Sequence, residues 1–350
     1  MRTYGYAATN ANQPLAPFVF ERRELRPNDI AFDILYCGVC HSDLHYVRND
    51  WGISRYPLVP GHELVGRVTA VGNKVTSHRI GDLVAVGTIV DSCSHCDMCL
   101  GHEEQLCRNG ASYTYSSKDL VTGETTQGGY SKHFVVRDDF ALKMPEGLDP
   151  SRVGPLLCAG ITTYTPLKNY NIGPGSRVGV VGIGGLGHLA VKLAVAMGAE
   201  VTVITRSRDK ADEAKALGAH KVLLSSAGEA MAGAAFSLDL IIDTIPVSHD
   251  VTPYLALLDF RGTLMIVGQL GQMEAFNSFP LLGGRRRIEG SGTGGLAATQ
   301  ELLNFCAEKN VLPECEIISI QDINAAFERM ERGDVRYRFV IDMATLVDVA

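Results

Sequence analysis

The chain has 350 residues, of which 46% are hydrophobic and 20% charged, as in an ordinary globular protein with room for two domains. The net charge is −7 and no basic run stands out, which argues against nucleic-acid binding. The first twenty residues lack the basic start and apolar core of a signal peptide. The longest apolar stretch, residues 178–197, is broken by five glycines, so we expect no membrane span and a soluble, cytoplasmic protein.

Residues 1 to about 150 contain short strand-like runs that are separated by glycine and proline. The clearest runs cover residues 29–36, 64–71 and 82–86. Short strands with frequent turn residues between them predict a small, irregular, β-rich domain.

Four cysteines then fall within fifteen residues, in the pattern Cys-x2-Cys-x2-Cys-x7-Cys: Cys93, Cys96, Cys99 and Cys107. Four thiolates can close a tetrahedral shell around Zn2+ with no position left for substrate, so the pattern predicts a structural zinc site. Two disulfides are one alternative, which a reducing compartment disfavours. An iron–sulfur cluster is another, but its fourth cysteine usually follows after three residues and precedes proline, whereas Cys107 follows after seven and precedes Arg108. We expect His95 to be a solvated loop residue.

The pattern changes near Pro174, where strands begin to alternate with helices. A strand at 177–181 leads through a glycine turn into an apolar helix, and a strand at 201–205 precedes a helix at 209–217. Further strands are predicted at residues 221–224, 238–243, 263–267 and 287–289. This alternation predicts a doubly wound parallel sheet with both faces covered. We expect the last part of the chain, with helices at 299–308 and 323–332 and a strand at 338–342, to return to the first domain.

The glycine turn after the first of these strands fits G-x-G-x-x-G: Gly182, Ile183, Gly184, Gly185, Leu186 and Gly187. Its position between a strand and a helix is the context that dinucleotide binding requires. Gly182 permits the tight turn, Gly184 lets the backbone approach a pyrophosphate, and Gly187 lets helix and strand pack closely. The alternative is a glycine-rich turn without a ligand.

The end of the next strand distinguishes between the two nicotinamide cofactors. NAD-binding chains usually carry Asp or Glu there to bind the ribose 2′-hydroxyl, but this strand ends at Thr205. Arg206, Ser207 and Lys210 follow and could bind a 2′-phosphate, so we expect NADP(H). The alternative is a charged helix start on the surface.

Three further residues, Cys40, His62 and Cys158, are candidates for a second site, although spacing alone does not connect them. Cys37 and Cys40 have the spacing of a Cys-x-x-Cys redox pair, and Cys158 could be an inert core thiol.

The motifs together resemble the zinc-dependent medium-chain alcohol dehydrogenases, in particular the cinnamyl-alcohol-dehydrogenase-like branch of NADP-dependent aldehyde reductases. The resemblance covers nearly the whole chain and rests on residues 37–45, 61–66, 93–107, 157–162, 182–187 and 334–342. It implies an α/β fold, in which a Rossmann doubly wound parallel sheet accompanies a β-rich GroES-like catalytic domain. The catalytic domain would span 1–155, with a zinc lobe at about 91–108, the dinucleotide-binding domain 156–294, and 295–350 would return to the catalytic domain.

The resemblance also implies a catalytic zinc held by Cys40, His62 and Cys158, with Glu63 beside it, and therefore two zinc ions per chain. Two thiolates and an imidazole leave a fourth position open for substrate or water. By the same resemblance Cys37 is not a ligand, which removes the redox-pair interpretation. Ser42 and His45 would form a proton relay.

Further cofactor contacts follow from the same resemblance: Ser42, Thr162, Thr244, Gly268, Ser291, Gly292 and Thr293. Residues 291–295 are richer in glycine than the family's usual sequence there, which leaves the shape of the substrate pocket open. Trp51 either borders the substrate cleft or serves packing alone.

The implied activity is the reversible reduction of aldehydes to primary alcohols with NADPH, over a broad range of aldehydes, by a homodimer. A non-catalytic nucleotide-binding relative and a dehydrogenase of secondary alcohols or polyols are the alternatives. A zinc hydrolase or deaminase is disfavoured, because residues 62–66 lack the second histidine of H-E-x-x-H and do not contain H-x-E either.

Overall fold

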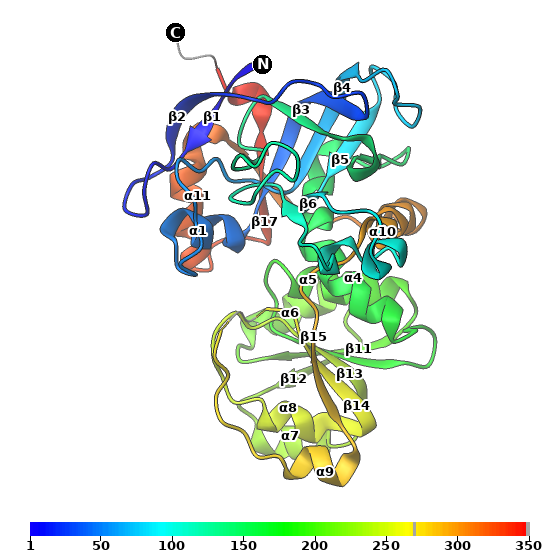
Figure 1. The fold of residues 1–350 in the computed structure, drawn as a ribbon. Helices are drawn as coiled ribbons and strands as arrows, with labels where there is room; N and C mark the ends of the chain where they lie inside the picture. Colours follow the sequence, from blue (N-terminus) through cyan, green and yellow to red (C-terminus); the bar gives the residue numbers. More distant parts are fainter. Residues whose placement is uncertain (269–270, 348–350) are drawn as a thin grey trace. The chain divides into compact units, whose positions relative to one another are not determined.

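The computed structural model of the chain describes residues 1–268 and 271–347, and the chain divides into two compact units. Unit 1 contains Met1–Cys158 and Gly294–Ala350, and unit 2 contains Ala159–Thr293 (Figure 1). The C-terminal part of the chain therefore belongs to the same unit as the N-terminal part.

Unit 1 is built around one long strand, β3, Asp29–Val39. Six other strands of the described residues join it in a sheet of order β16-β17-β3-β4-β5-β9, with β8 also paired to β3. Their bounds are β4 Leu64–Val71, β5 Leu83–Val86, β8 His133–Arg137, β9 Leu142–Lys143, β16 Cys315–Ser319 and β17 Arg338–Asp342. β17 enters the sheet antiparallel to β3, with Phe339 opposite Val39, so the C-terminal segment completes the sheet.

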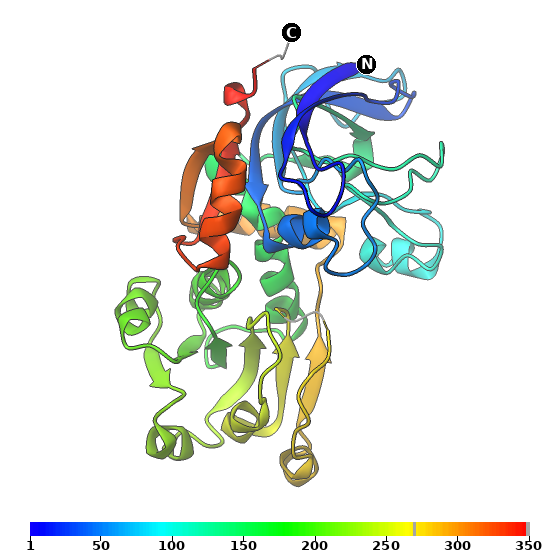
Figure 2. The ribbon, with the colours of Figure 1, turned by 90° about the vertical axis from the view of Figure 1, so that its left-hand side faces the viewer.

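Two smaller pairs of strands and several short helices surround this sheet. The pairs are β1 Arg2–Ala7 with β2 Ala16–Glu21, and β6 Ile89–Asp91 with β7 Ser112–Tyr113. The helices are α1 His41–Arg48, α2 Asp97–Leu100, α3 Pro150–Val153, α10 Leu296–Lys309 and α11 Ile323–Glu331, and the 3₁₀ helices are η1 Glu104–Leu106, η2 Asp138–Phe140, η3 Gly154–Leu157, η4 Ile320–Asp322 and η5 Met343–Thr345. Figure 2 shows α11, in orange-red, alongside the strands of this unit. The aromatic side chains at the centre of the core are fully buried: Phe32, Tyr130, Phe140 and Phe339.

The limits of the units differ slightly from the domain limits expected at 155 and 294. Unit 1 extends to Cys158, because η3 packs against β3, β4 and β5 of its sheet. Gly294 also belongs to unit 1, and a Cβ atom on the adjacent Gly295 would lie 1.9 Å from the carbonyl oxygen of His102. The chain thus joins unit 1 one residue earlier than expected, where it meets the cysteine-rich loop.

Unit 2 contains a parallel sheet of six strands, in the order β12-β11-β10-β13-β14-β15. The strands are β10 Arg177–Val181, β11 Glu200–Thr205, β12 Lys221–Leu224, β13 Leu238–Asp243, β14 Leu258–Ile266 and β15 Arg287–Gly290. The helices are α4 Ala159–Asn169, α5 Gly187–Ala196, α6 Asp209–Ala216, α7 Gly228–Gly233, α8 Thr252–Leu257 and α9 Phe279–Gly284. In Figure 1, α5 and α6 lie on one face of the sheet, and α7, α8 and α9 lie on the other. This order of strands is the doubly wound Rossmann arrangement, whose ligand crevice lies at the carboxyl ends of the strands.

The predicted strands at 177–181, 221–224, 238–243 and 338–342 are confirmed with the same bounds. β14 begins five residues earlier than predicted, at Leu258, with an irregularity in its pairing after that residue. In the described part of the chain, none of the helices combines the length and apolar character needed to span a bilayer.

Candidate active site

Four side chains that are far apart in the sequence converge in unit 1: those of Cys40, His62, Glu63 and Cys158. One ligand atom of each lies within 4.8 Å of the others. Cys40 stands between β3 and α1, and His62 and Glu63 immediately precede β4, which pairs with β3. Cys158 follows η3, which packs on both strands. The pairing of β3 with β4 therefore brings the candidate ligands together, which spacing alone could not indicate.

The buried carboxylate of Asp43 fixes the geometry of this cluster. Its Oδ2 accepts the backbone N–H of Cys40 at 2.9 Å, as in a capping box at the start of α1. Its Oδ1 accepts the backbone N–H of Gly61 and lies 3.0 Å from Nδ1 of His62. Because Nδ1 of His62 is held by Asp43, Nε2 is the nitrogen that remains for a metal.

The two cysteines of the cluster share a hydrogen bond, with Sγ atoms 3.8 Å apart. The hydrogen bond from Cys158, with help from His62 and Arg338, lowers the pKa of the Cys40 thiol well below its usual value, against the effect of burial. The hydrogen bond to Cys40 and burial raise the pKa of Cys158. A cation that displaced the thiol protons would find two sulfur ligands here.

Glu63 adds a second buried carboxylate, which forms an ion pair with Arg338 of β17 through Oε1. Burial raises the pKa of Glu63 to about 7, although Arg338 lowers it. Its other oxygen, Oε2, is buried and has no hydrogen-bond partner. Two sulfurs, one imidazole nitrogen and one carboxylate oxygen form a donor set that fits Zn2+.

The predicted relay residues lie on α1, one turn apart. Ser42 Oγ lies 3.7 Å from Cys40 Sγ, at the edge of the cluster. His45 Nδ1 lies 2.7 Å from a carboxylate oxygen of Asp50, which the sequence analysis did not single out. The Trp51 ring packs 5.1 Å from that of His45 and edge-on against Tyr46, so Trp51 contributes to packing around His45.

The four cysteines of the predicted structural site also meet. One ligand atom of each of Cys93, Cys96, Cys99 and Cys107 lies within 4.8 Å of the others, and all nine cysteines are unbridged, against the disulfide alternative. The sulfurs of Cys93 and Cys107 accept backbone N–H groups at 3.4 and 3.5 Å. His95 is exposed, as predicted, and its Nδ1 lies 2.5 Å from the backbone oxygen of Cys93. The loop is tied to the helix α10, because Oε2 of the buried Glu104 accepts the N–H of Leu296.

The glycine turn of unit 2 has the predicted position between β10 and α5. Gly182 adopts φ +86°, a backbone conformation that residues with a Cβ atom rarely adopt. A Cβ atom on Gly187 would lie 2.2 Å from the carbonyl oxygen of Gly182. A Cβ atom on Gly184 would meet nothing within 4 Å. The turn thus needs glycine at 182 and 187 to fold, whereas the open space beside Gly184 fits an approaching pyrophosphate.

The residues predicted to bind a 2′-phosphate lie after β11, with mixed surroundings. Thr205 is buried and Arg206 is exposed. Ser207 Oγ accepts the N–H of Asp209 at the start of α6, so it also serves the helix start. Lys210 Nζ donates to the carbonyl oxygen of Ile183 at 2.9 Å, which links this strand end to the glycine turn.

The other predicted cofactor contacts of unit 2 gather near the carboxyl ends of its strands. Thr244 follows β13 and donates through Oγ1 to Val181 at 2.7 Å, and a Cβ atom on Gly268 would lie 2.4 Å from the backbone of Thr244. Ser291 donates its N–H to the carbonyl oxygen of Ile266, and Thr162 donates to the carbonyl oxygen of Gly292 at 2.9 Å. Thr293 ends the unit. Their position at the strand ends is where a Rossmann sheet binds its ligand.

Comparison with known proteins identifies both units. Residues 26–146 match the family model of the alcohol dehydrogenase GroES-like domain, and residues 185–308 match that of the zinc-binding dehydrogenases. Over 352 aligned residues, the chain is 48% identical to 8-hydroxygeraniol dehydrogenase of Catharanthus roseus, with 100% of this chain and 97% of the relative covered.

Solved structures agree with this match. A cinnamyl alcohol dehydrogenase from Sorghum bicolor superimposes with a TM-score of 0.96 at 42% identity, covering 100% of both chains. A Helicobacter pylori CAD complexed with NADP(H) superimposes with a TM-score of 0.91 at 37% identity, covering 99% of both.

A GroES-like unit with a cysteine–histidine cluster, joined to a Rossmann unit, defines a zinc-binding dehydrogenase. The chain belongs to the zinc-dependent medium-chain alcohol dehydrogenases, in the cinnamyl-alcohol-dehydrogenase-like branch. It is an oxidoreductase of the alcohol dehydrogenase class.

The first prediction concerns Asp43. In Asp43→Asn the side chain no longer offers two acceptor oxygens to its buried donors, so the affinity of the Cys40 cluster for zinc should fall by about 10- to 100-fold. Competition with a chelator measures it. Asp33→Asn is the control, because Asp33 also contacts a histidine, His133, but is half exposed. Equal zinc affinity in Asp43→Asn and Asp33→Asn would contradict the prediction.

The second prediction separates two glycines of the turn. Gly187→Ala should lower the free energy of unfolding by about 1–3 kcal/mol, because its Cβ atom would overlap Gly182. Gly184→Ala should leave that free energy within about 0.5 kcal/mol of the native value but weaken NADPH binding, because the methyl group enters open space. Thermal unfolding and fluorescence titration with NADPH measure the two effects. Undiminished NADPH affinity in Gly184→Ala would show that the turn does not approach the cofactor.

Proposed function

We propose that the protein reversibly reduces aldehydes to primary alcohols with NADPH, at a zinc ion held by Cys40, His62 and Cys158. The observation that carries the proposal is the buried cluster of two sulfurs and one imidazole nitrogen, oriented by Asp43, in a chain that also contains a dinucleotide-binding turn. Three protein ligands leave room for a substrate oxygen, as in catalytic zinc sites.

When bound, zinc supplies a Lewis acid for the carbonyl oxygen and NADPH supplies the hydride. The residues of the chain set up this chemistry. Cys40 and Cys158 provide sulfur ligands, Asp43 holds the His62 ring, and Arg338 holds Glu63 beside the cluster. Glu63 would act as a neighbour of the ligand shell or as a transient ligand.

The proton of the new alcohol is proposed to come from Ser42, which lies at the edge of the cluster. His45 would return that proton from solvent, because an imidazole ring can accept a proton at one nitrogen and donate one from the other. Asp50 holds Nδ1 of His45, which leaves Nε2 for this exchange.

The cluster of Cys93, Cys96, Cys99 and Cys107 is proposed to hold a second zinc ion with no catalytic role. Four sulfurs fill a tetrahedral shell completely. This zinc would stabilise a loop with little hydrophobic core of its own. Through the hydrogen bond between Glu104 and Leu296, the loop would also fix the start of α10.

NADP(H) is proposed because no carboxylate ends β11. Arg206, Ser207 and Lys210 follow the position of the missing acid along the chain, and the structure of a relative contains NADP(H). Lys210 could bind a phosphate while it stays close to the glycine turn.

Several further parts of the proposal rest on the resemblance. Unit 1 would be the catalytic domain and unit 2 the cofactor domain of a cytoplasmic homodimer with broad aldehyde scope. Activity on secondary alcohols or polyols, and loss of catalysis altogether, are the competing possibilities. A panel of aliphatic, aromatic and terpenoid aldehydes with NADPH tests the aldehyde scope and shows whether the protein catalyses reduction at all.

The third prediction concerns the cofactor. The ratio kcat/KM on one aldehyde should be higher with NADPH than with NADH, and Arg206→Asp should mainly raise the KM for NADPH, because it places a negative charge beside the 2′-phosphate. Lys215→Asp makes the same charge change in the last turn of α6 and serves as the control. A preference for NADH, or an equal KM in Arg206→Asp and the native protein, would refute the assignment.

The fourth prediction concerns the metal. The purified protein should contain two zinc ions per chain, and Cys40→Ser should fold, keep one and lose turnover, because a catalytic ligand is removed. Metal analysis and aldehyde reduction assays measure both. Cys37→Ser is the matched control from the same Cys-x-x-Cys motif and should keep both ions and turnover. Full activity in Cys40→Ser would end the catalytic-zinc proposal.

A further inference from the structure

A second segment of unit 1, residues 127–131, runs beside the turn that carries His62. Its backbone N–H groups bond the carbonyl oxygens of that turn: Gly128 to Val59 at 2.7 Å, Tyr130 to Pro60 at 2.9 Å and Gly129 to Gly61 at 2.8 Å. The side chain of Gln127 also accepts the N–H of Val59. The position of the His62 turn is therefore set by a segment more than sixty residues further along the chain.

The two segments approach so closely that no side chain fits between them at Gly61. Gly61 adopts φ +100°, and a Cβ atom there would lie 2.6 Å from the ring of Tyr130. The Tyr130 side chain is fully buried, and its hydroxyl donates to Oδ2 of Asp43 at 3.2 Å. Because the two segments lie so close together, the phenol of Tyr130 contacts the carboxylate of Asp43, which holds His62.

The carboxylate of Asp43 accepts hydrogen bonds from several segments of unit 1. Cys40 and Gly61 donate backbone N–H groups, His62 contributes Nδ1, and Tyr130 contributes the phenol on the oxygen that Cys40 also uses. Tyr130 donates from a segment outside α1 and the His62 turn. Without its hydroxyl, Oδ2 would lose a donor in a buried site, where a missing hydrogen bond is costly.

A second phenol, that of Tyr115, reaches the same carboxylate, and its ring lies 5.7 Å from that of His62. Burial, together with the charge of Asp43, raises the pKa of both Tyr115 and Tyr130 well above the usual value. Both phenols therefore keep their protons and can act as hydrogen-bond donors to Asp43.

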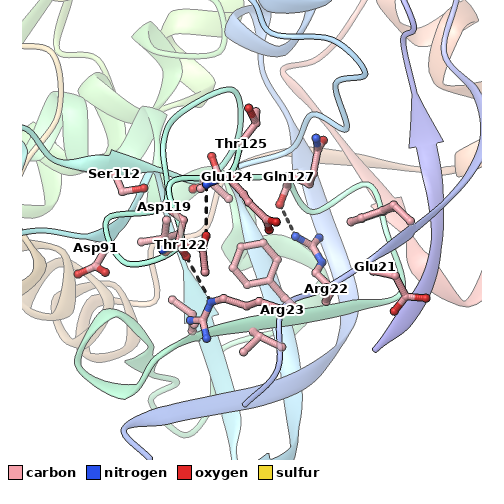
Figure 3. Close-up of a pocket in the computed structure, with 17 residues that line it drawn as sticks. Glu21, Arg22, Arg23, Asp91, Ser112, Asp119, Thr122, Glu124, Thr125 and Gln127 are labelled. Atoms are coloured by element: carbon pink, nitrogen blue, oxygen red, sulfur yellow. Dashed lines mark hydrogen bonds and ion pairs between the residues drawn. The ribbon is translucent and has the colours of Figure 1, made fainter. Parts of the chain in front are cut away.

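The side chain of Arg22 holds residues 127–131 in place by hydrogen bonds. Arg22 also lines a pocket of about 80 Å³. Its guanidinium donates to the carbonyl oxygens of Gln127, Gly128 and His133 and to the hydroxyl of Ser131. The side chain lies between the rings of Phe20 and Phe134, at 4.8 and 4.5 Å. Figure 3 shows Arg22 directed at Gln127, whereas the neighbouring Arg23 is directed at Asp119. Because the guanidinium of Arg22 donates its hydrogen bonds to this segment, we assign Arg22 to holding the segment and not to binding a ligand in the pocket.

We propose that Tyr130 is a positioning residue for the catalytic metal, and that Arg22 anchors the segment that carries it. The Tyr130 hydroxyl orients the Asp43 carboxylate, which in turn orients His62 so that Nε2 faces Cys40 and Cys158. This proposal rests on the proposed function, in which these three residues hold zinc.

The test follows the release of zinc from the purified full-length protein to an excess of the chelator pyridylazoresorcinol. Cys40→Ser identifies which phase of release belongs to the catalytic cluster. In Tyr130→Phe that phase should become about tenfold faster, the lower end of the range for residues that orient metal ligands. The phase of the four-cysteine site should keep its native rate. In the Co2+-substituted protein, Tyr130→Phe should also change the visible bands of the catalytic site, because the ligand geometry changes.

Tyr56→Phe is the matched control. It removes the same hydroxyl group from a tyrosine of unit 1, but that hydroxyl donates to the carbonyl oxygen of Val47 and not to Asp43. Both phases of zinc release should keep their native rates in this variant. A double-mutant cycle adds Arg22→Lys, which should accelerate release in the native background and have a smaller effect when Tyr130 is already Phe.

The outcomes separate the two proposals. If Cys40→Ser and the native protein contain the same amount of zinc, the cluster does not hold the metal and the proposed function fails first. If Cys40→Ser lacks one zinc ion but Tyr130→Phe releases zinc at the native rate with an unchanged Co2+ spectrum, only the role of Tyr130 is overturned. Equal acceleration of both phases would also overturn it, because that result indicates a general loss of stability.

Discussion

The buried carboxylate of Asp43 is the constraint on which the rest of the site depends. It joins the start of α1, the His62 turn and the segment that carries Tyr130, and its bonds to Cys40, Gly61 and His62 are 2.9 to 3.0 Å long. A buried carboxylate is costly unless donors surround it, so these segments must assemble together. The same bonds fix which nitrogen of His62 faces the two cysteines. The contacts that hold these segments of unit 1 together are therefore the same contacts that position the metal ligands.

The second constraint is the buried ion pair between Glu63 and Arg338, which connects the site to the C-terminal part of the chain. Arg338 is the first residue of β17. The next residue of β17, Phe339, pairs with Val39 of β3, which precedes Cys40. Removing one partner of a buried pair typically costs about 3–5 kcal/mol, because the other charge is left buried without compensation, so the position of Glu63 depends on Arg338. In unit 2 the cofactor residues depend instead on the parallel sheet, whose strands end side by side.

Local signals made much of the fold predictable, and contacts between distant residues account for what was missed. The strand at 177–181, the glycine turn and the four-cysteine loop each have a pattern within a few residues, and the structure contains them. The role of Asp43 was only weakly predictable from the sequence, because its position three residues after Cys40 is that of an acidic capping-box residue. Tyr130 and Arg338 have none, because their partners lie 87 and 275 residues away. Helix α10 likewise starts three residues before its predicted start, since Glu104 of the cysteine loop accepts its first N–H.

The central claim is that Asp43 holds Nδ1 of His62, so that Nε2, Cys40 and Cys158 share one zinc ion. Anomalous diffraction at the zinc edge, on crystals of the protein as purified, tests it most directly. The expected result is a zinc peak at about 2.0–2.1 Å from Nε2 and about 2.3 Å from the two sulfurs. A zinc-loaded four-cysteine site with no anomalous peak at His62, or a peak beside Nδ1, would contradict the claim.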